Sequence, residues 1–165
     1  EFLDDDNNPV APGEAGEVTI TTLGVTGMPL VRFKTGDVVY HYDEPCRCGR
    51  NTVRVSSVVG RKKQMIKFKG TTLYPPALFD ILDNIPDVKN YVVEVFTNEL
   101  GTDDVLVRVG TLTPGERFEK EIKDIFRAKV RVAPGVIFDT PENVSKIMFP
   151  PMSRKPVKFI DKRRH

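Results

Sequence analysis

The spacing of the hydrophobic residues changes part-way along the chain, and this change limits the folds that the chain can adopt. Before Gly60, three segments alternate between apolar and polar residues or run apolar, and they end at glycines or polar turns. This pattern is typical of β-strands. The three segments are residues 16–24, 29–42 and 51–60. In the third segment, Val53, Val55 and Val58 are expected to face the core.

After Tyr74 the apolar residues recur at helical spacing. Pro75 and Pro76 suit the first turn of a helix, because proline lacks the backbone N–H that this turn leaves unpaired. The apolar residues that follow lie three and four positions apart and form one helical face. They are Leu78, Ile81, Leu82 and Ile85.

A second helix is predicted within residues 113–129. Thr113 is its expected N-cap, Pro114 its first residue, and Glu116 the partner that completes a capping box. Its expected buried stripe consists of Phe118, Ile122, Ile125 and Phe126. Short strands are predicted around the two helices, at residues 64–70, 90–98, 103–110 and 135–140. An irregular tail is expected after the last of these strands.

The order of these elements predicts an α+β fold in two parts. Residues 1–59 are interpreted as a β-rich segment, residues 60–63 as a hinge, and residues 64–165 as a small β-α-β-β-α-β domain. The sequence does not begin with methionine, so we expect it to be a fragment of a longer protein.

The charge balance of the chain disfavours one class of function. The chain has 25 Lys and Arg residues against 23 Asp and Glu residues, which gives a formal net charge of +2. It therefore lacks the overall positive charge typical of nucleic-acid-binding domains. No apolar segment has the length of a membrane span, and no signal peptide is visible. We expect a cytoplasmic protein with reduced cysteines and with neither nucleic-acid nor membrane partners.

Asp37 closes the motif RFKTGD. A Thr-Gly-Asp turn at the end of a strand presents a carboxylate that can accept two hydrogen bonds, as from a vicinal diol. The alternative is an ordinary turn that contains aspartate, since tripeptides of this kind are common.

The segment GRKKQMIKFKG, residues 60–70, concentrates five cations without an acid. A solvated strand face is one interpretation, and it suits Lys67 and Lys69. Arg61 and Lys63 lie where the two predicted parts meet, which favours a cationic hinge.

Cys46 and Cys48 lie in the motif PCRCGR. Two thiolates two residues apart can bind one metal ion, but a closed zinc site needs about four ligands. His41 is the one additional candidate nearby, so the sequence predicts half a site. The alternative is a pair of free thiols in a turn, because a disulfide between these residues would be strained.

Residues 153–164 form the basic segment SRKPVKFIDKRR. A basic segment near a chain end is commonly solvated and poorly ordered. Lys155, which precedes Pro156, could instead be an ordered cation that stabilises the charge developing in acyl or phosphoryl transfer.

The order and separation of these motifs resemble the C-terminal part of the phenylacetate–CoA ligase family. The motifs are PLVRFKTGD, CRCGR, GRKKQMIKFKGTTLYPPAL and SRKPVKFIDKR, and the resemblance covers nearly the whole chain. This family belongs to the adenylate-forming superfamily of acyl-CoA synthetases, luciferases and peptide-synthetase adenylation domains. The resemblance implies that residues 1–59 end a large N-terminal domain and that residues 64–165 form its mobile C-terminal lid.

The resemblance also implies roles for five positions. Asp37 matches the aspartate that holds the ribose hydroxyls of the adenylate, and Arg61 matches an arginine that also approaches the ribose. Lys63 falls on the hinge position, and Gly70 matches the glycine of a loop that lines the pantetheine tunnel. Lys155 matches the catalytic lysine that contacts the acid carboxylate and the α-phosphate.

Two further features follow from the same resemblance. The family pattern before the catalytic lysine is S-x-G-K, and Arg154 stands here in place of that glycine. The pair Cys46 and Cys48 recurs in relatives, where upstream Cys and His residues could complete a zinc site. Those residues would precede Glu1.

The implied reaction has two steps. A small carboxylic acid, phenylacetate or a similar aryl acid, attacks the α-phosphate of ATP to give an acyl-adenylate, and CoA thiolate then displaces AMP. The implied cofactors are ATP, CoA and Mg²⁺, with the Mg²⁺ ligands outside this chain, and zinc where its site is complete. The fragment alone is expected to be inactive. A homodimer is compatible with the resemblance.

Two alternatives stay open at this point. An adenylating enzyme of the same superfamily could pass its acyl group to an acceptor other than CoA. A non-catalytic module could instead bind RNA or a protein partner through its basic strand and tail. Apart from Phe68, however, the basic segments lack the interleaved aromatic side chains that stack on bases.

Overall fold

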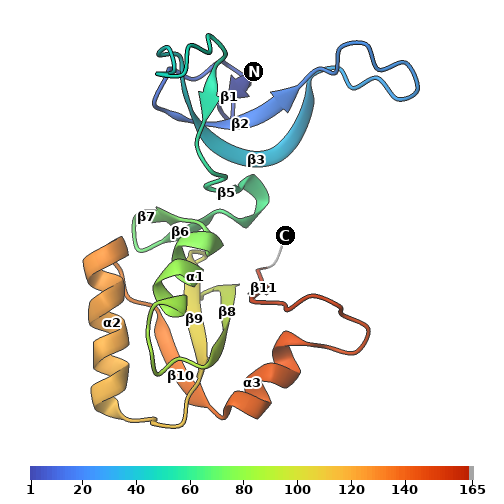
Figure 1. The fold of residues 1–165 in the computed structure, drawn as a ribbon. Coiled ribbons are helices and arrows are strands. Elements are labelled where there is room, and N and C mark those ends of the chain that lie inside the picture. Colours follow the sequence, from blue (N-terminus) through green and yellow to red (C-terminus); the bar gives the residue numbers. More distant parts are fainter. Residues whose placement is uncertain (164–165) are drawn as a thin grey trace. The chain divides into compact units, whose positions relative to one another are not determined.

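The computed structural model describes residues 1–163, and these form two compact units (Figure 1). The first unit is Glu1–Gln64, and the second begins at Met65. The boundary follows the segment predicted as a hinge, residues 60–63. The last two residues of the predicted lid domain, Arg164 and His165, lie outside the described residues.

The first unit is a five-stranded sheet in which four shorter strands surround one long strand, β3. These strands are β1 (Phe2–Leu3), β2 (Ala15–Ile20), β3 (Phe33–Tyr42), β4 (Arg54–Val55) and β5 (Gly60–Arg61). They pair in the order β1-β2-β3-β4, and β5 also pairs with β3. Figure 1 shows β3 curving through the unit, so that this strand organises most of it.

The predicted third strand of this unit is wrong over most of its length. Within residues 51–60 the strands are Arg54–Val55, which pairs with β3 over two residues, and Gly60 at the start of β5. Val53, Val55 and Val58 are all about half exposed rather than buried. Alternation along a chain shows which side chains share a face, but it does not show whether another layer covers that face.

The second unit is a four-stranded sheet with helices on both faces and a separate hairpin. Its sheet has the order β10-β9-β8-β11, in which β8 and β9 are antiparallel and both outer strands are parallel to their neighbours. The sheet strands are β8 (Asn90–Thr97), β9 (Asp103–Gly110), β10 (Gly135–Asp139) and β11 (Phe159–Asp161). The hairpin is β6 (Ile66–Phe68) and β7 (Thr71–Leu73), and the helices are α1 (Pro75–Asp83), α2 (Glu116–Val130) and α3 (Pro141–Met148).

The segment at the start of β8 explains why helices cover both faces of this sheet. Tyr91 and Val93 pack in one cluster with the apolar residues of α1, α2 and the hairpin. Val92 packs on the opposite face against Val144 and Met148 of α3. Because successive side chains of a strand point to opposite faces, a continuous apolar run needs cover on both sides.

The predicted apolar faces of the first two helices are confirmed. Leu78, Ile81 and Leu82 of α1 are buried, and Ile85 just beyond the helix is buried as well. In α2 the three buried apolar positions are Phe118, Ile122 and Phe126, while Ile125 is partly buried against the same cluster.

The predicted start of α2 is wrong. The helix begins at Glu116 with Gly115 as its N-cap, and no side chain caps it. The side chain of Thr113 does not cap the first turn; its Oγ1 lies 3.4 Å from Oγ1 of Thr111, which also accepts from the backbone N–H of Thr113. A capping box needs the threonine directly before the first helical residue, and here the chain inserts two residues between them.

The predicted irregular tail is also wrong, because it contains a helix and a strand. Thr140 caps α3 by accepting a hydrogen bond of 3.3 Å from the N–H of Asn143, and Pro141 occupies the first turn. The strand β11 then pairs with β8, so the end of the chain joins the sheet as an edge strand. In the described residues no helix is both long and apolar enough to span a membrane.

Candidate functional site

Asp37 and Arg61 lie directly opposite each other on β3 and β5. Nε of Arg61 is 3.3 Å from Oδ1 of Asp37, and the aspartate side chain is one-third exposed. A carboxylate has two oxygens that can each accept more than one hydrogen bond, so a single arginine contact leaves acceptor capacity free. The pair therefore presents a partly exposed carboxylate with a cation beside it, which suits a ligand that carries hydroxyls and a phosphate.

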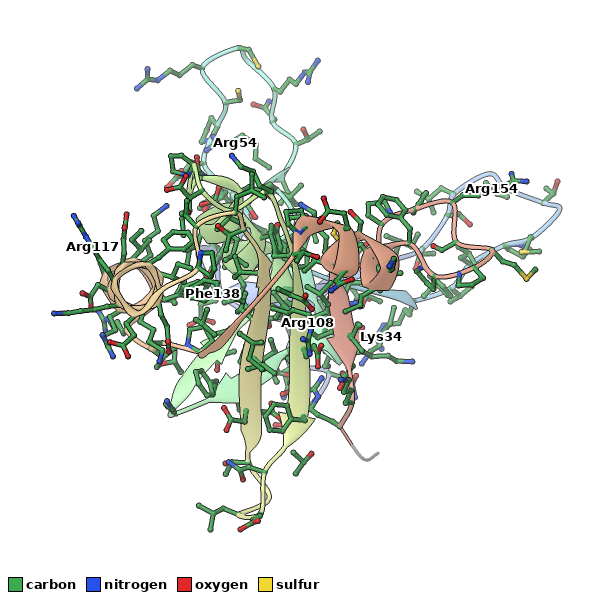
Figure 2. The ribbon with its side chains drawn as sticks, turned by 90° about the horizontal axis from the view of Figure 1, so that it is seen from below. Lys34, Arg54, Arg108, Arg117, Phe138 and Arg154 are labelled. Carbon is green, nitrogen blue, oxygen red and sulfur yellow. The ribbon has the colours of Figure 1, made fainter. Side chains whose placement is uncertain are left out.

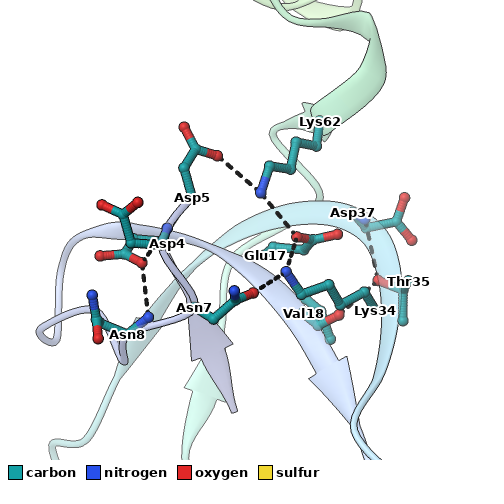
Figure 3. Close-up of polar contacts among 11 residues, drawn as sticks. Asp4, Asp5, Asn7, Asn8, Glu17, Val18, Lys34, Thr35, Asp37 and Lys62 are labelled. Atoms are coloured by element: carbon teal, nitrogen blue, oxygen red, sulfur yellow. Dashed lines mark hydrogen bonds and ion pairs between the residues drawn. The ribbon is translucent and has the colours of Figure 1, made fainter.

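A bulge in β3 places Asp37 at this position. Three residues of β3 lie opposite Val18 of β2, and Gly36 in the middle has a φ of +79°, which favours glycine. Oγ1 of Thr35 donates to the carbonyl of Val18 and accepts from the N–H of Asp37, both at 3.1 Å (Figure 3). The Thr-Gly-Asp motif is thus a braced bulge inside a strand, and the prediction of a turn at a strand end is corrected.

Lys62 is held inside the first unit by two carboxylates (Figure 3). Its Nζ lies 2.9 Å from Oδ1 of Asp5 and 3.1 Å from Oε2 of Glu17. Glu17 is nearly buried and is also 3.6 Å from Nζ of Lys34. The hydrogen bond to Asp5, and then that to Glu17, raise the pKa of Lys62 above its ordinary value. Lys62 therefore fixes the end of the first unit, a role that local sequence spacing does not reveal.

Lys63 follows in a short 3₁₀ turn, Lys62–Gln64, which ends the first unit. Its side chain is exposed. Lys63 thus comes directly after Lys62, which is anchored to Asp5 and Glu17, and two residues before the second unit begins at Met65.

Gly70 lies in the two-residue turn between β6 and β7. Lys69 has a φ of +48° and Gly70 a φ of +78°, so both central residues adopt the left-handed conformation of a type I′ turn. A Cβ atom at Gly70 would meet nothing within 4 Å. The need for glycine at this position is therefore conformational rather than steric.

Lys155 lies on the loop between α3 and β11. The N–H of Val157 donates to the carbonyl of Met148 at 2.7 Å and closes the base of this loop. Within the loop, Oγ of Ser153 donates to the carbonyl of Lys155 at 2.6 Å. The Lys155 side chain is exposed and has no carboxylate partner among the described residues. Figure 2 shows the neighbouring Arg154 on the same projecting loop.

Lys158, three residues further on, is part of the fold. Its Nζ donates to Oδ1 of Asp83 at 3.0 Å and to the hydroxyl oxygen of Tyr91 at 2.9 Å. Burial works against ionisation of Asp83, but hydrogen bonds from Lys158 and Tyr91 hold its pKa below the ordinary value. Burial and the Asp83 carboxylate raise the pKa of the Tyr91 hydroxyl.

The other described cations after Lys158 are also engaged. Nζ of Lys162 lies 2.5 Å from Oε2 of Glu94, and Arg163 pairs with Asp103 and Asp161. Lys158, Lys162 and Arg163 of the basic segment are thus paired with carboxylates of the second unit.

Cys46 and Cys48 present two free thiols whose sulfur atoms are 3.0 Å apart. The backbone and thiol of Cys48 donate to Cys46 and, together with the charge of Arg54, lower its pKa. His41 does not join them in a ligand cluster, since it is buried and its ring stacks on Phe2 at 4.5 Å. The described residues hold no group of three or more potential metal ligands. Two thiols fit half of a zinc site, so residues 1–163 do not by themselves supply a complete one.

Of the predicted positions, the structure brings Asp37 and Arg61 together in the first unit. Gly70 and Lys155 lie in the second unit on two different loops, the β6–β7 turn and the loop before β11.

No protein-family model matches the chain. Comparison with curated sequences finds 33% identity over 115 residues with a phenylacetate–coenzyme A ligase of Thermus thermophilus. The chain is a homologue of phenylacetate–CoA ligases. Enzymes of the same name from Aromatoleum evansii and Escherichia coli are 29% identical over 97 residues and 33% identical over 73 residues.

These matches with phenylacetate–CoA ligases cover much of this chain but little of each relative. They span 69%, 58% and 44% of the chain, and 26%, 21% and 16% of the respective relatives. The matched part is the C-terminal portion of those ligases.

Solved structures of adenylate-forming ligases share the fold of this phenylacetate–CoA ligase homologue. A 2-hydroxyisobutyryl-CoA ligase in complex with an acyl-AMP has a TM-score of 0.77 at 23% identity, over 98% of this chain and 35% of that one. An anthranilate CoA ligase in complex with anthranoyl-AMP has a TM-score of 0.63 at 17% identity, over 95% and 31%. At these identities the likeness establishes the fold alone, and the α+β prediction is confirmed.

Proposed function

We propose that this chain is the C-terminal part of an AMP-forming ligase that joins a small carboxylic acid to CoA. Phenylacetate or a similar aryl acid is the proposed substrate. The proposal rests chiefly on the pairing of Asp37 with Arg61 in a chain whose curated homologues are phenylacetate–CoA ligases. In the first unit, Asp37 accepts hydrogen bonds from the two ribose hydroxyls of the nucleotide, and Arg61 lies beside the same sugar.

In the adenylation step, a carboxylate oxygen of the acid attacks the α-phosphorus of ATP. The bond from this phosphorus to the bridging oxygen of the diphosphate breaks, and diphosphate leaves. Lys155 stabilises the negative charge that develops on the α-phosphate and orients the acid. Its exposure and its lack of a carboxylate partner in the described chain support this role, because an already paired lysine would have to give up that pair first.

In the second step the CoA thiolate attacks the acyl carbon, and AMP leaves. Lys63 acts as the hinge about which the second unit turns between the two steps. Gly70 then faces the pantetheine path, and its left-handed turn keeps that surface free of a side chain.

The proposal includes two metal ions. Mg²⁺ accompanies ATP in the proposed reaction, and we place its ligands outside this chain. Zinc would require two further ligands beside Cys46 and Cys48, also from outside this chain.

The test compares two half-reactions in a polypeptide that joins this chain to the remaining three-quarters of a phenylacetate–CoA ligase. Acid-dependent release of diphosphate measures adenylation, and AMP release from pre-made acyl-adenylate with CoA measures thioester formation. Lys63→Pro should impair thioester formation more than adenylation, since proline restricts φ at the hinge. The 165-residue chain alone should form no acyl-adenylate. Adenylation by this chain alone, or equal loss of both steps in Lys63→Pro, would contradict these assignments.

A second candidate function is transfer of the acyl group to an acceptor other than CoA. It is favoured by one observation, since an amide bond synthetase also shares this fold, with a TM-score of 0.56 at 18% identity. Omission of CoA from the complete enzyme distinguishes the candidates, because a CoA ligase then stops at the adenylate while an amide synthetase proceeds with an amine. Binding of RNA is the least supported alternative, because Lys158, Lys162 and Arg163 are already paired within the second unit.

A further inference from the structure

A groove of about 640 Å³ lies within the second unit, where the end of α2 meets the β6–β7 turn and the chain that leads into β10. Figure 1 shows this end of α2 beside the hairpin. Four cations line the groove, with one carboxylate, that of Asp104. The four cations are Lys69, Lys123, Arg127 and Arg131. Residues 132–135 supply an apolar edge.

Two of these cations stand in backbone conformations that are unfavourable for residues with a side chain. Lys69 has a φ of +48° and Arg131 a φ of +66°. Only five described residues other than glycine have a positive φ, and these two line the same groove. Arg131 follows the last residue of α2, a position that glycine commonly occupies because it accepts this conformation without strain. Lys69 likewise precedes Gly70 in a type I′ turn where Asn-Gly is preferred.

The same two cations lack carboxylate partners. Arg131 has no ion pair among the described residues, and Lys69 makes only a marginal contact of 3.5 Å with the carbonyl of Ala133 and a cation–π contact of 4.8 Å with the Phe68 ring. In contrast, Lys123 pairs with Glu119 and Arg127 pairs with Asp124 along the helix. The groove is therefore lined by two cations that have carboxylate partners and two that have none.

Compensation of the helix dipole does not explain this arrangement fully. Cations in the last turn of a helix do stabilise its carboxyl end, and Arg127 and Lys129 are well placed for that. Lys69, however, lines the groove from a different element, the β6–β7 turn, so the needs of the end of α2 do not explain its place there. Lys69 and Arg131 both keep an unfavourable backbone conformation in the same groove, and such conformations often occur at binding sites.

We propose that this groove binds the phosphate groups of a nucleotide. Lys69 and Arg131 would contact phosphate oxygens directly, and Arg131 can do so through two parallel N–H donors. Lys123 and Arg127 would add attraction from the flank, and the apolar edge at residues 132–135 would accept a ribose or base. The inference goes beyond the ligase proposal, and where the nucleotide is that of CoA it adds a contact to that reaction.

The test is titration of the 165-residue chain itself at low salt, followed by calorimetry and by backbone NMR shifts. The ligands are inorganic diphosphate, ADP, CoA and 3′-dephospho-CoA. Shifts at Lys69 and at residues 131–135 are expected with at least one of them. A preference for CoA over dephospho-CoA would identify the 3′-phosphate as a recognised group, whereas equal binding of diphosphate would show that phosphate alone is recognised. Absence of binding by all four ligands would overturn the proposal, whatever the ligase assays show.

The variants separate ligand binding from folding, because the two are expected to move in opposite directions. Arg131→Gly and Lys69→Asn each remove a cation and also relieve an unfavourable φ. Each should weaken binding about tenfold, the equivalent of one charge-assisted hydrogen bond. Each should also raise the melting temperature of the second unit by about 1–4 °C. If these residues had only a structural role, the two substitutions would not weaken ligand binding while raising the melting temperature.

Matched controls complete the design. Arg117 is an exposed arginine on α2 that does not line the groove, and Figure 2 shows it on the outer side of that helix. Arg117→Gln should leave the affinity within about twofold, while Arg131→Gln should weaken it about tenfold. Asp104→Asn should tighten binding severalfold, because it removes the one carboxylate of the groove. Equal losses in Arg117→Gln and Arg131→Gln would mean that only general charge is sensed, and would overturn the proposal.

Discussion

Nζ of Lys158 lies 3.0 Å from Oδ1 of Asp83, a residue 75 positions earlier in the sequence. The same ammonium donates to the hydroxyl of Tyr91, and the carbonyl of Lys158 accepts from the N–H of Val93. Lys158 thus ties the end of the loop that carries Lys155 to both α1 and β8. Two lysines three residues apart therefore differ, because Lys158 is held by the fold whereas Lys155 is exposed and has no carboxylate partner among the described residues.

Lys158→Met should destabilise the second unit by about 1 kcal/mol at pH 7, since the pair is partly exposed and the loss is limited by solvent screening. Urea denaturation measures this, with Arg154→Met as a control that should change little. The folded-state pKa of Asp83 is lowered, so its contribution is present above the unfolded value of about 3.9 and is lost as the pH falls through the folded value. The difference between the two proteins should therefore narrow at acidic pH. An unchanged stability at pH 7 would contradict the structural role.

The sequence predicted apolar faces better than it predicted helix ends. The stripe of Phe118, Ile122 and Phe126 repeats over several turns, so it does not depend on any single residue. A cap depends on one residue at one position, and Thr113 fits the common capping pattern without occupying that position. The threonine that does cap a helix is Thr140, which also precedes a proline and lies at the start of the short helix α3. Val144 and Met148, four positions apart, were the available sign of that helix.

Thr140→Ala should therefore cost about 1 kcal/mol of stability, the usual loss for an N-cap threonine. Thr113→Ala should cost less than about half of that, because its side chain caps nothing. Denaturant titration of the two variants gives the comparison directly. Equal losses would indicate that α3 does not depend on its cap.

In the candidate site, too, the sequence indicates residues within a short motif but not their partners in other strands. The Thr-Gly-Asp motif identified Asp37 because its residues are adjacent. The bulge that orients it depends on Val18 in another strand, and the anchoring of Lys62 depends on Asp5 and Glu17. Such partners are set by strand pairing, and no pattern within a short segment contains them.

Asp37→Ala in the complete ligase should weaken ATP binding at least about tenfold, because it removes charge-assisted hydrogen bonds worth roughly 1.5–3 kcal/mol each. Equilibrium binding of ATP measures the effect. Asp43→Ala is a suitable control, since that exposed carboxylate also lies in the first unit but only near His41. The fold should survive the change, because Asp37 is one-third exposed. An unchanged affinity for ATP in a folded Asp37→Ala variant would contradict the proposed contact of Asp37 with the ribose.

The 165-residue chain should bind zinc only weakly through Cys46 and Cys48, because two thiolates supply half of a tetrahedral shell. Competition with a chromophoric chelator measures this affinity. Cys48→Ser should abolish the weak binding, whereas His41→Gln should leave it unchanged, since His41 packs on Phe2. The complete enzyme should carry about one zinc per chain if it supplies the missing ligands. Metal-free complete enzyme, purified without chelator, would instead favour two free thiols.

Lys155→Ala should slow adenylation in the complete enzyme by roughly 100-fold, a loss typical for one group that stabilises transition-state charge. The same variant, supplied with pre-made acyl-adenylate and CoA, should form thioester at a nearly normal rate, because the lysine acts only before the second unit turns. Diphosphate release and AMP release measure the two steps separately.

The control for this prediction is Arg154→Ala. Arg154 is also exposed on the same loop, so a tail that acted only through its positive charge would make the two residues interchangeable. Lys158 is unsuitable as a control, because its loss would release the loop from Asp83 and Tyr91 and move Lys155 indirectly. If Arg154→Ala and Lys155→Ala slow adenylation equally, or if Lys155→Ala slows both steps alike, the assigned role is wrong. A selective loss in Lys155→Ala alone would separate the chemistry of one ammonium from the general charge of its loop.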